Sequence, residues 1–321
     1  MARRTSNKIQ PAVMTITLPT PSVSGGATGR SYVDLSQIAS LVNRRFYRQG
    51  LNWAVAGFKV SSLQPGAVSM AKLPNTWVTS NAWEKAFRAW NKQQMEAIED
   101  AGAESAVARF RDFKVFADPV HVTAGVAANL LPVDFGGNSY APGEWEESII
   151  VLPQLLPDAS GTDILPQEYK LHVVGTNKNG TASRGIIEGY ADSRAYPQSP
   201  DPVSPLIGSD QNWLRQMFDV GSDNVEITEN ATDRNDDLPY PQVDYPGGQT
   251  QAPGLEYHDF ATIFESNAVN GIGVQRMKGG NFPCGLIAFD WSPVNSANLV
   301  IQIDLVPGNH RGYLCEPMTE M

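Results

Sequence analysis

Glycine and proline recur along the whole of this 321-residue chain, and their frequency limits what the chain can fold into. The sequence holds 28 glycines and 23 prolines, spread from one end to the other. Both residues interrupt regular structure, so this spacing favours many short elements joined by turns. With 41% hydrophobic and 18% charged residues, the chain can also bury a substantial core. The sequence therefore predicts a β-rich globular fold.

Eight segments have the composition of strands, because they are rich in β-branched or aromatic residues and are bounded by Gly, Pro or Asn. They span residues 12–18, 51–62, 66–73, 113–118, 147–156, 168–176, 283–291 and 298–308. Eight strands with long loops predict an all-β fold, a two-sheet β-sandwich. The eight-stranded jelly roll is the version that we expect, since it accepts long, decorated loops.

Two segments have helical periodicity and predict two or three helices inserted into this sandwich. The first begins at Asp34 or Ser36, either of which can cap a helix, and Gly50 can end it. The second covers residues 80–113, with Ser80 or Asn81 as its expected cap and Gly102 as a break. Its aromatic stripe, which includes Trp83, Phe87 and Trp90, is expected to lie in the core.

The first thirty residues differ from the rest in composition. They contain the Pro/Ser/Gly-rich stretch PTPSVSGGATG and few large side chains, which predicts a flexible basic arm over residues 1–30. We find no internal repeat and no clear linker, so residues 31–321 are expected to form a single jelly-roll domain. The first fifty residues carry seven basic side chains and one acidic one, although the whole chain has a formal net charge of −10. This asymmetry suggests that one end of the chain faces a polyanion.

The basic side chains gather around two aromatic rings in the sequence RRFYR. Arginines can contact phosphates, and aromatic rings can stack on unpaired bases, which is how many proteins bind single strands without sequence preference. The alternative is that Phe46 packs inward and the arginines are merely exposed. The candidate nucleic-acid interface consists of Arg3, Arg4, Lys8, Arg44, Arg45, Phe46, Tyr47 and Arg48.

Signs of catalysis are absent from the sequence. It has no G-x-S-x-G, H-E-x-x-H or Walker A motif, and its four histidines, His121, His172, His258 and His310, are scattered. The two cysteines and the histidines lack metal-ligand spacing, and the acidic segment 219–244 is expected to be a solvated loop. No secretory signal and no membrane-spanning run is apparent. We therefore expect no enzymatic activity, no cofactor, no metal and no membrane partner.

Several blocks of the sequence, with the ending LVPGNHRGYLCEPMTEM, make the chain resemble a known family. They include KLPNTWVTSNAWEKAFRAWNKQQMEAIEDAGAESAVARFRDFKVF, AYPQSPDPVSP, NWLRQMFDVG and DLPYPQVDYPGG. The chain resembles the capsid proteins of small circular, Rep-encoding single-stranded DNA viruses, over nearly its full length. The resemblance implies a jelly-roll subunit that assembles with about 60 copies of itself into an icosahedral shell. It further implies a circular single-stranded DNA genome inside the virion, assembly in a host cell and an unknown host receptor.

One departure from that family concerns the arm, which often is strongly arginine-rich but here carries only Arg3, Arg4 and Lys8. The segment Arg44–Arg48 can supplement the arm and face the shell interior, or small cations can balance the genome charge. Two other classes of function stay open. One is a carbohydrate-binding or adhesive β-sandwich whose aromatic loops stack on sugars. The other is a glycosidase-like enzyme, for which Glu144, Glu146 and Glu147 are the nearest carboxylates in sequence.

Overall fold

The computed structural model describes residues 11–103, 105, 107, 111–152, 167–176, 183–195, 254–264 and 271–321. The chain divides into two compact units. The first comprises Met1–Asn75, Ala124–Glu146 and Glu256–Met321, and the second comprises Thr76–Thr123 and Glu147–Leu255. We had expected a single domain over residues 31–321. Both segments of the second unit are insertions between parts of the first unit. A single linker between an N-terminal and a C-terminal domain is therefore not expected in the sequence.

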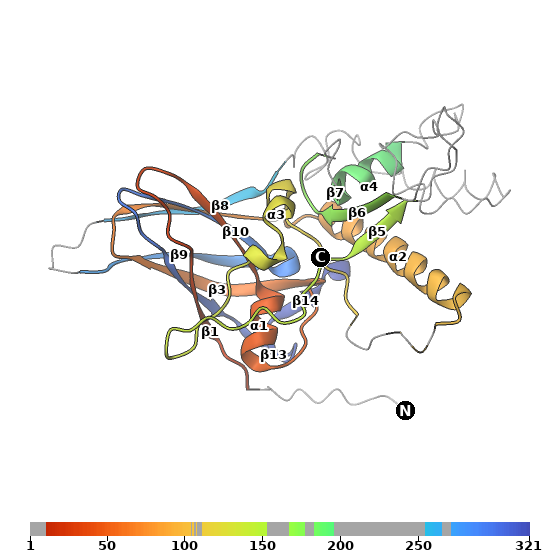
Figure 1. Ribbon diagram of the computed structural model, residues 1–321, viewed down its shortest axis with the longest axis horizontal. Coiled ribbons are helices and arrows are strands. Elements are labelled where there is room, and N and C mark those ends of the chain that lie inside the picture. Colours follow the sequence, from red (N-terminus) through yellow and green to blue (C-terminus); the bar gives the residue numbers. More distant parts are fainter. Residues whose placement is uncertain are drawn as a thin grey trace. The chain divides into compact units, whose positions relative to one another are not determined.

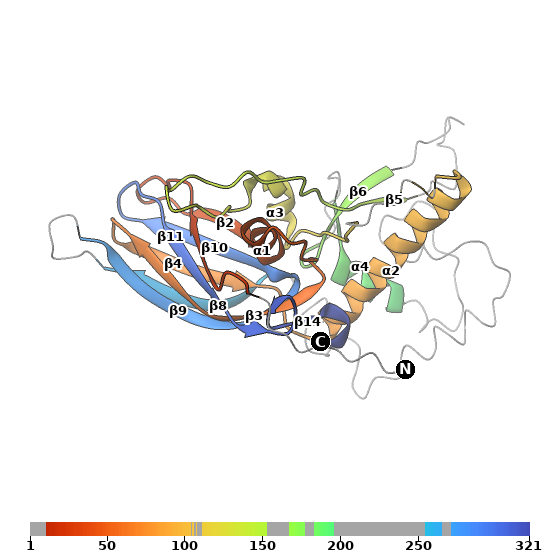
Figure 2. The ribbon, with the colours of Figure 1, turned by 90° about the horizontal axis from the view of Figure 1, so that it is seen from below.

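Two antiparallel sheets build the first unit (Figure 1). In one, β11 (Val300–Leu305) lies between β1 (Thr15–Pro19) and β3 (Leu51–Ser62). The other edge of β3 pairs with β9 (Gly273–Phe282), and β14 (Cys315–Pro317) pairs with the start of β3. The second sheet has the order β2 (Gly29–Asp34), β10 (Leu286–Pro293), β4 (Gly66–Lys72) and β8 (Glu256–Ile263), as Figure 2 shows from another side.

The strands of the two sheets are paired in a nested order. Eight strands remain when the short strands after β11 are set aside. The first of the eight pairs with the eighth, β1 with β11, and the second pairs with the seventh, β2 with β10. The third pairs with the sixth, β3 with β9, and the fourth with the fifth, β4 with β8. This order places strands that are far apart in sequence next to each other, so the sheets depend on long-range pairing.

Alternating side chains of these strands form the core of the first unit. Along β11, Ile301, Ile303 and Leu305 are buried while the residues between them are not, as the period of a half-buried strand requires. Phe58 of β3 packs edge-on against Phe282 and Phe289, with ring centroids 5.4 and 5.7 Å apart. Each such edge-to-face contact stabilises the fold by about 1 kcal/mol beyond the contribution of the apolar area that the rings bury.

The mostly β character that we predicted is confirmed, and both sheets of the first unit are antiparallel, but three predicted strands do not belong to these sheets. Residues 113–118 contain only an isolated bridge at Phe116, and the segments 147–156 and 168–176 give β5 (Ile149–Leu152) and β6 (Gln167–His172) of the second unit. Of the strands in these two sheets, the prediction missed β2, β8, β9 and the short β14. In β2, β8 and β9, glycines or charged side chains interrupt the apolar pattern on which the prediction depended.

The segment that we expected to be a flexible arm contains regular structure. Within residues 11–30, β1 forms the edge of one sheet and β2 begins at Gly29. Val23 also forms an isolated bridge with Ala297. Residues 1–10, with three of the predicted site residues, lie outside the described part of the chain.

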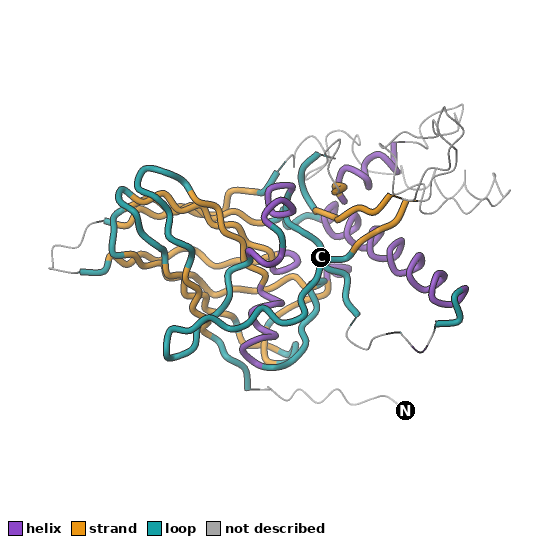
Figure 3. The backbone as a smooth tube through the Cα atoms, viewed as in Figure 1, coloured by secondary structure: helices purple, strands orange, loops and turns teal. Residues whose placement is uncertain are grey.

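The second unit combines helices with a three-stranded sheet, β5–β6–β7 (β7, Ser183–Gly185). Its helix α2 (Trp77–Asp100) is capped by Thr76, four residues before the predicted cap Ser80, and the hydroxyl of Thr76 accepts the backbone N–H of Thr79. Trp83 and Trp90 are buried as predicted. Two further helices are α3 (Pro119–Ala124) and α4 (Ile186–Ala195), and Figure 3 shows these helices in purple. None of the described helices is both long and apolar enough to cross a membrane.

Candidate nucleic-acid interface

The predicted basic segment lies directly after the helix α1 (Leu35–Asn43), not on it. Asp34, one of the two predicted caps, is the N-cap, but the helix ends at Asn43 and not near Gly50. Arg44 causes this early end, since it adopts the left-handed conformation with φ 52° and ψ 41° and donates its N–H to the carbonyl of Ser40. Residues 44–50 therefore form a loop, and their side chains point in directions that helical spacing does not predict.

Tyr47 is the one member of this loop's aromatic pair that is fully buried. Its ring packs against Trp53 and Tyr313, with centroids 5.8 and 5.4 Å away, and its hydroxyl donates to the carbonyl of Arg311 at 3.0 Å. A ring enclosed in this way cannot stack on a base. The burial of Tyr47 therefore argues against a stacking role for this ring, and its place in the interface stays a prediction.

The arginines of the loop differ in how they are held. Arg45 is half-buried and donates from Nη1 to the carbonyl of Pro11 at 3.0 Å. Arg44 and Arg48 are exposed, and the guanidinium of Arg48 lies over the ring of Phe46 at 5.7 Å from its centroid. Arg311, from the other end of the chain, is exposed and donates to the carbonyl of Phe46.

Phe46 is half-buried, and its ring lies 6.3 Å from that of Trp145. The exposed carboxylates Glu144 and Glu146 flank Trp145 in sequence, so the surroundings of Phe46 are not uniformly basic. Arg44, Arg48 and Arg311 can contact phosphates from this surface, whereas Phe46 offers only part of a ring for stacking.

The buried carboxylate of Asp34 lies next to this loop and binds one of its residues, Gln49. Asp34 accepts hydrogen bonds from the backbone N–H groups of Ser36 and Gln37, from Gln49 Nε2 and from Trp145 Nε1. Burial raises the pKa of Asp34 to about 6, and these hydrogen bonds act in the opposite direction. Asp34 thus connects the start of α1 to Gln49 at the end of the basic loop and to Trp145, whose ring lies near that of Phe46. Its role is to position the loop.

Arg3, Arg4 and Lys8, the remaining members of the predicted interface, lie outside the described residues. The acidic segment 219–244 lies outside them as well.

A second group of basic residues, which we did not single out from the sequence, lies on the first sheet. Lys59 of β3 is directly opposite Arg276 of β9, and Lys278 follows two residues later on β9. All three side chains are exposed. The signal in the sequence is the stretch VQRMK, in which Met277 is buried and its basic neighbours are exposed with the period of a strand.

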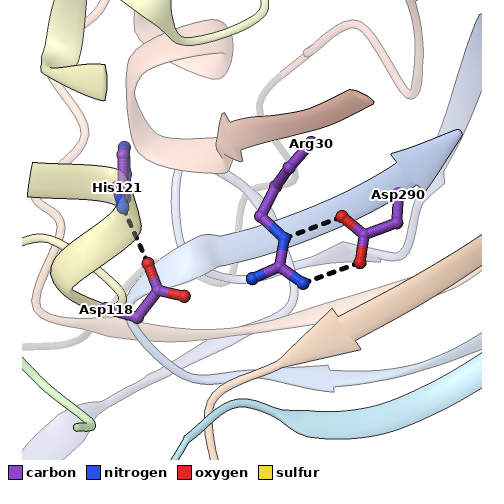
Figure 4. A network of polar contacts seen from close by, with 4 residues as sticks. All are labelled: Arg30, Asp118, His121 and Asp290. Atoms are coloured by element: carbon purple, nitrogen blue, oxygen red, sulfur yellow. Dashed lines mark hydrogen bonds and ion pairs between the residues drawn. The ribbon is translucent and has the colours of Figure 1, made fainter. Parts of the chain in front are cut away.

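The histidines and carboxylates of the described residues do not assemble a recognisable catalytic group. Figure 4 shows two polar contacts, each within its own unit. Arg30 forms a bidentate ion pair with Asp290, with both N–O distances 2.7 Å. His121 donates its backbone N–H to Asp118, and its Nδ1 accepts the N–H of Ala117 at 3.1 Å.

Metal ligands are also missing from this part of the protein. Among the residues described, no three His, Cys, Asp or Glu side chains are grouped so that they could hold a metal ion. Glu147, considered above for a glycosidase pair, forms an ion pair with Lys170 at 2.5 Å.

Comparisons with known proteins add no relative. No protein-family model matches the chain, and neither the curated proteins nor the solved structures contain a match to it.

Proposed function

We propose that this chain is a viral coat protein that self-assembles into a closed icosahedral shell around a circular single-stranded DNA genome. The observation that carries the proposal is the nested pairing of β1 with β11, β2 with β10, β3 with β9 and β4 with β8. This is the order in which a jelly roll winds four hairpins into two four-stranded sheets, and we propose that topology for the first unit. Jelly rolls recur in viral capsid and lectin domains.

The sequence resemblance described above supports the same proposal independently of the strand order. So does the presence of exposed aromatic side chains, which a shell subunit needs for contacts with its neighbours. Phe135, at the tip of the loop after Pro132, is fully exposed, and Tyr257 and Phe260 of β8 are 67% and 50% exposed. In an isolated monomer such rings would stay in water, whereas contacts between subunits would bury them.

A carbohydrate-binding module is the second candidate, and the same exposed rings favour it. Tyr257 and Phe260 could stack on sugar faces, and lectins share the jelly-roll scaffold. The two functions differ in assembly, because a lectin module needs no closed shell and binds no nucleic acid.

The test is to express the full chain, separate it by size-exclusion chromatography and image it by negative-stain electron microscopy. We expect uniform closed particles whose absorbance ratio at 260 and 280 nm stays high after nuclease treatment. Monomers or small oligomers at every salt concentration and pH tested would overturn the coat-protein proposal. Glycan-array binding by those small species would then support the lectin.

A further inference from the structure

The outer face of the first sheet carries three basic side chains at the edge formed by β3 and β9. The strand register places Lys59 directly opposite Arg276 and Gly57 opposite Lys278. Side chains opposite each other in an antiparallel pair have Cβ atoms about 5 Å apart, and residues two apart on one strand are separated by about 7 Å. Lys59, Arg276 and Lys278 therefore form one compact basic cluster on a rigid surface.

Such a pair is unfavourable for the isolated fold. Like charges directly opposite each other on neighbouring strands destabilise a sheet, and nothing about the packing requires the pair, because both side chains are exposed. A polyanion bound to this face would remove the repulsion between Lys59 and Arg276.

Neutralising partners for the cluster are few within the described part of the chain. None of the three side chains forms an ion pair or a hydrogen bond with another described residue. Asp259 of β8 accepts the backbone N–H of Lys278 at 2.7 Å. The charge of Lys278 contributes to the lowered pKa of Asp259, so this acid offsets part of one charge out of three.

The rest of this face can also bind a nucleic-acid backbone. Across β11 and β1, the row that contains Lys59 and Arg276 continues through Gln302 and Thr17, which are uncharged hydrogen-bonding residues. Asp304, in the neighbouring row, accepts the hydroxyl of Thr15 at 2.6 Å. A strand of phosphates lying along the row of Lys59 would meet cations at β9 and β3 and the uncharged Gln302 and Thr17 beyond them, whereas the row of Lys278 continues to the carboxylate of Asp304.

We propose that Lys59, Arg276 and Lys278 bind the phosphodiester backbone of single-stranded DNA on the outer face of this sheet. That the polyanion is single-stranded DNA rests on the proposed function. That the three basic side chains share one face follows from the strand register. The sheet would then present the genome with a flat, sequence-independent surface in addition to the loop that carries Arg44 and Arg48. If the protein forms shells, this face lies toward their interior.

The test compares the full-length protein with the triple variant Lys59→Gln/Arg276→Gln/Lys278→Gln. The matched control is Arg88→Gln/Lys92→Gln/Lys114→Gln, which removes the same number of lysines and arginines from the second unit. Binding of a fluorescent 30-nucleotide oligo(dT) to the unassembled fraction is followed by anisotropy between 50 and 300 mM NaCl. Each phosphate contact contributes about 0.7 to the slope of log K against log salt on single strands, so the triple variant should lose about 2 from that slope.

The result expected is weaker, less salt-dependent binding for the triple variant and unchanged binding for the control. The control should unfold at the wild-type temperature, and the triple variant at that temperature or slightly above it, because it lacks the repulsion between Lys59 and Arg276. Wild-type affinity and slope in the triple variant, or an equal loss in the control, would overturn the inference. Electron microscopy of the same samples tests the proposed function separately. DNA binding that needs the cluster in a protein without shells would leave the inference standing and remove the coat-protein proposal. Shells formed by a triple variant with unchanged DNA binding would support the coat-protein proposal and overturn the inference about the cluster.

Discussion

The hydroxyl of Tyr47 donates a hydrogen bond to the carbonyl of Arg311, although 264 residues separate the two in sequence. Arg311 in turn donates to the carbonyl of Phe46. This reciprocal contact fastens the basic loop after α1 to the C-terminal part of the first unit. It determines which side chains of the loop face solvent and which do not.

Replacing Tyr47 should change stability and leave DNA binding intact. Tyr47→Phe removes one hydrogen bond, which should lower the free energy of unfolding by about 1 kcal/mol. Tyr47→Ala should cost about 3–5 kcal/mol, because it leaves a cavity beside Trp53 and Tyr313. Urea titration followed by tryptophan fluorescence measures both. Loss of oligonucleotide binding by a Tyr47→Phe protein with nearly normal stability would contradict the structural role.

Removing charge from the loop should weaken DNA binding with little effect on folding. Arg44 and Arg48 are exposed, and the guanidinium of Arg48 lies over the ring of Phe46. Arg44→Gln/Arg48→Gln should reduce the salt slope of oligo(dT) binding by about 1.4, at 0.7 per contact. Anisotropy titrations check this. A slope identical to the wild type would show that the loop does not contact DNA.

Replacing Asp34 should alter the pH dependence of the first unit. Its pKa is raised by burial to about 6 from an ordinary value of 3.8, so the folded state holds this proton more tightly than the unfolded state. The free energy of unfolding should therefore decrease as pH rises from about 4 to about 6. Asp34→Asn removes this titration and keeps one acceptor oxygen, so its stability should vary less over the same window. Urea titrations at intervals of half a pH unit measure the difference.

The control for that experiment is Asp34→Ala. It removes every acceptor that Gln49, Trp145 and the first turn of α1 use. Loss of the N-cap alone costs about 1 kcal/mol, and the buried donors left without partners add to it. Equal stability of the Asn and Ala variants at pH 7 would contradict the positioning role of Asp34.

His172 should give the second unit the opposite pH dependence. It is fully buried, and burial lowers its pKa to about 4, although the nearby backbone of Gly175 and Thr176 acts in the other direction. Because the unfolded state binds the proton more tightly, the stability is fully present above pH 6.5 and is lost as pH falls toward 4. The pKa difference corresponds to about 3 kcal/mol.

Asp118 and Arg184 are the charged groups that also act on His172, the first favouring the protonated ring and the second opposing it. His172→Leu removes the titrating ring while keeping both of them. The variant should lose less stability than the wild type between pH 7.5 and pH 5 in urea titrations followed by circular dichroism. Identical losses would assign the pH dependence to other groups.

Local signals in the sequence predicted some elements well. Asp34 caps α1 because its side chain can reach the free N–H groups of the first turn, which is a property of neighbouring residues alone. The strand over 51–62 agrees with β3, since its buried apolar residues alternate along the segment except at Ala56 and Gly57, where the pairing with β11 is irregular. The mostly β character follows from strand composition and from the frequent turn residues.

Features that depend on distant contacts could not be predicted in this way. Arg44 ends α1 without a glycine or proline, because the next residues are held by Pro11 and Arg311. Strands β8 and β9 contain exposed charges and glycines and become strands through pairing with β4 and β3. The opposed pair of Lys59 and Arg276 is visible only once that register is known.

The pairing of the first strand with the last also fixes when the sandwich can form during synthesis. Thr15 of β1 and Asp304 of β11 are 289 residues apart, so at roughly 5–20 residues per second the ribosome needs roughly 15–60 s to supply the partner of β1. Until then β1 has an unpaired edge, and the unit inserted after β4 leaves the ribosome first. Translation speed and chaperones that shield this edge should therefore control the yield of folded protein more strongly than the stability of the finished sandwich does.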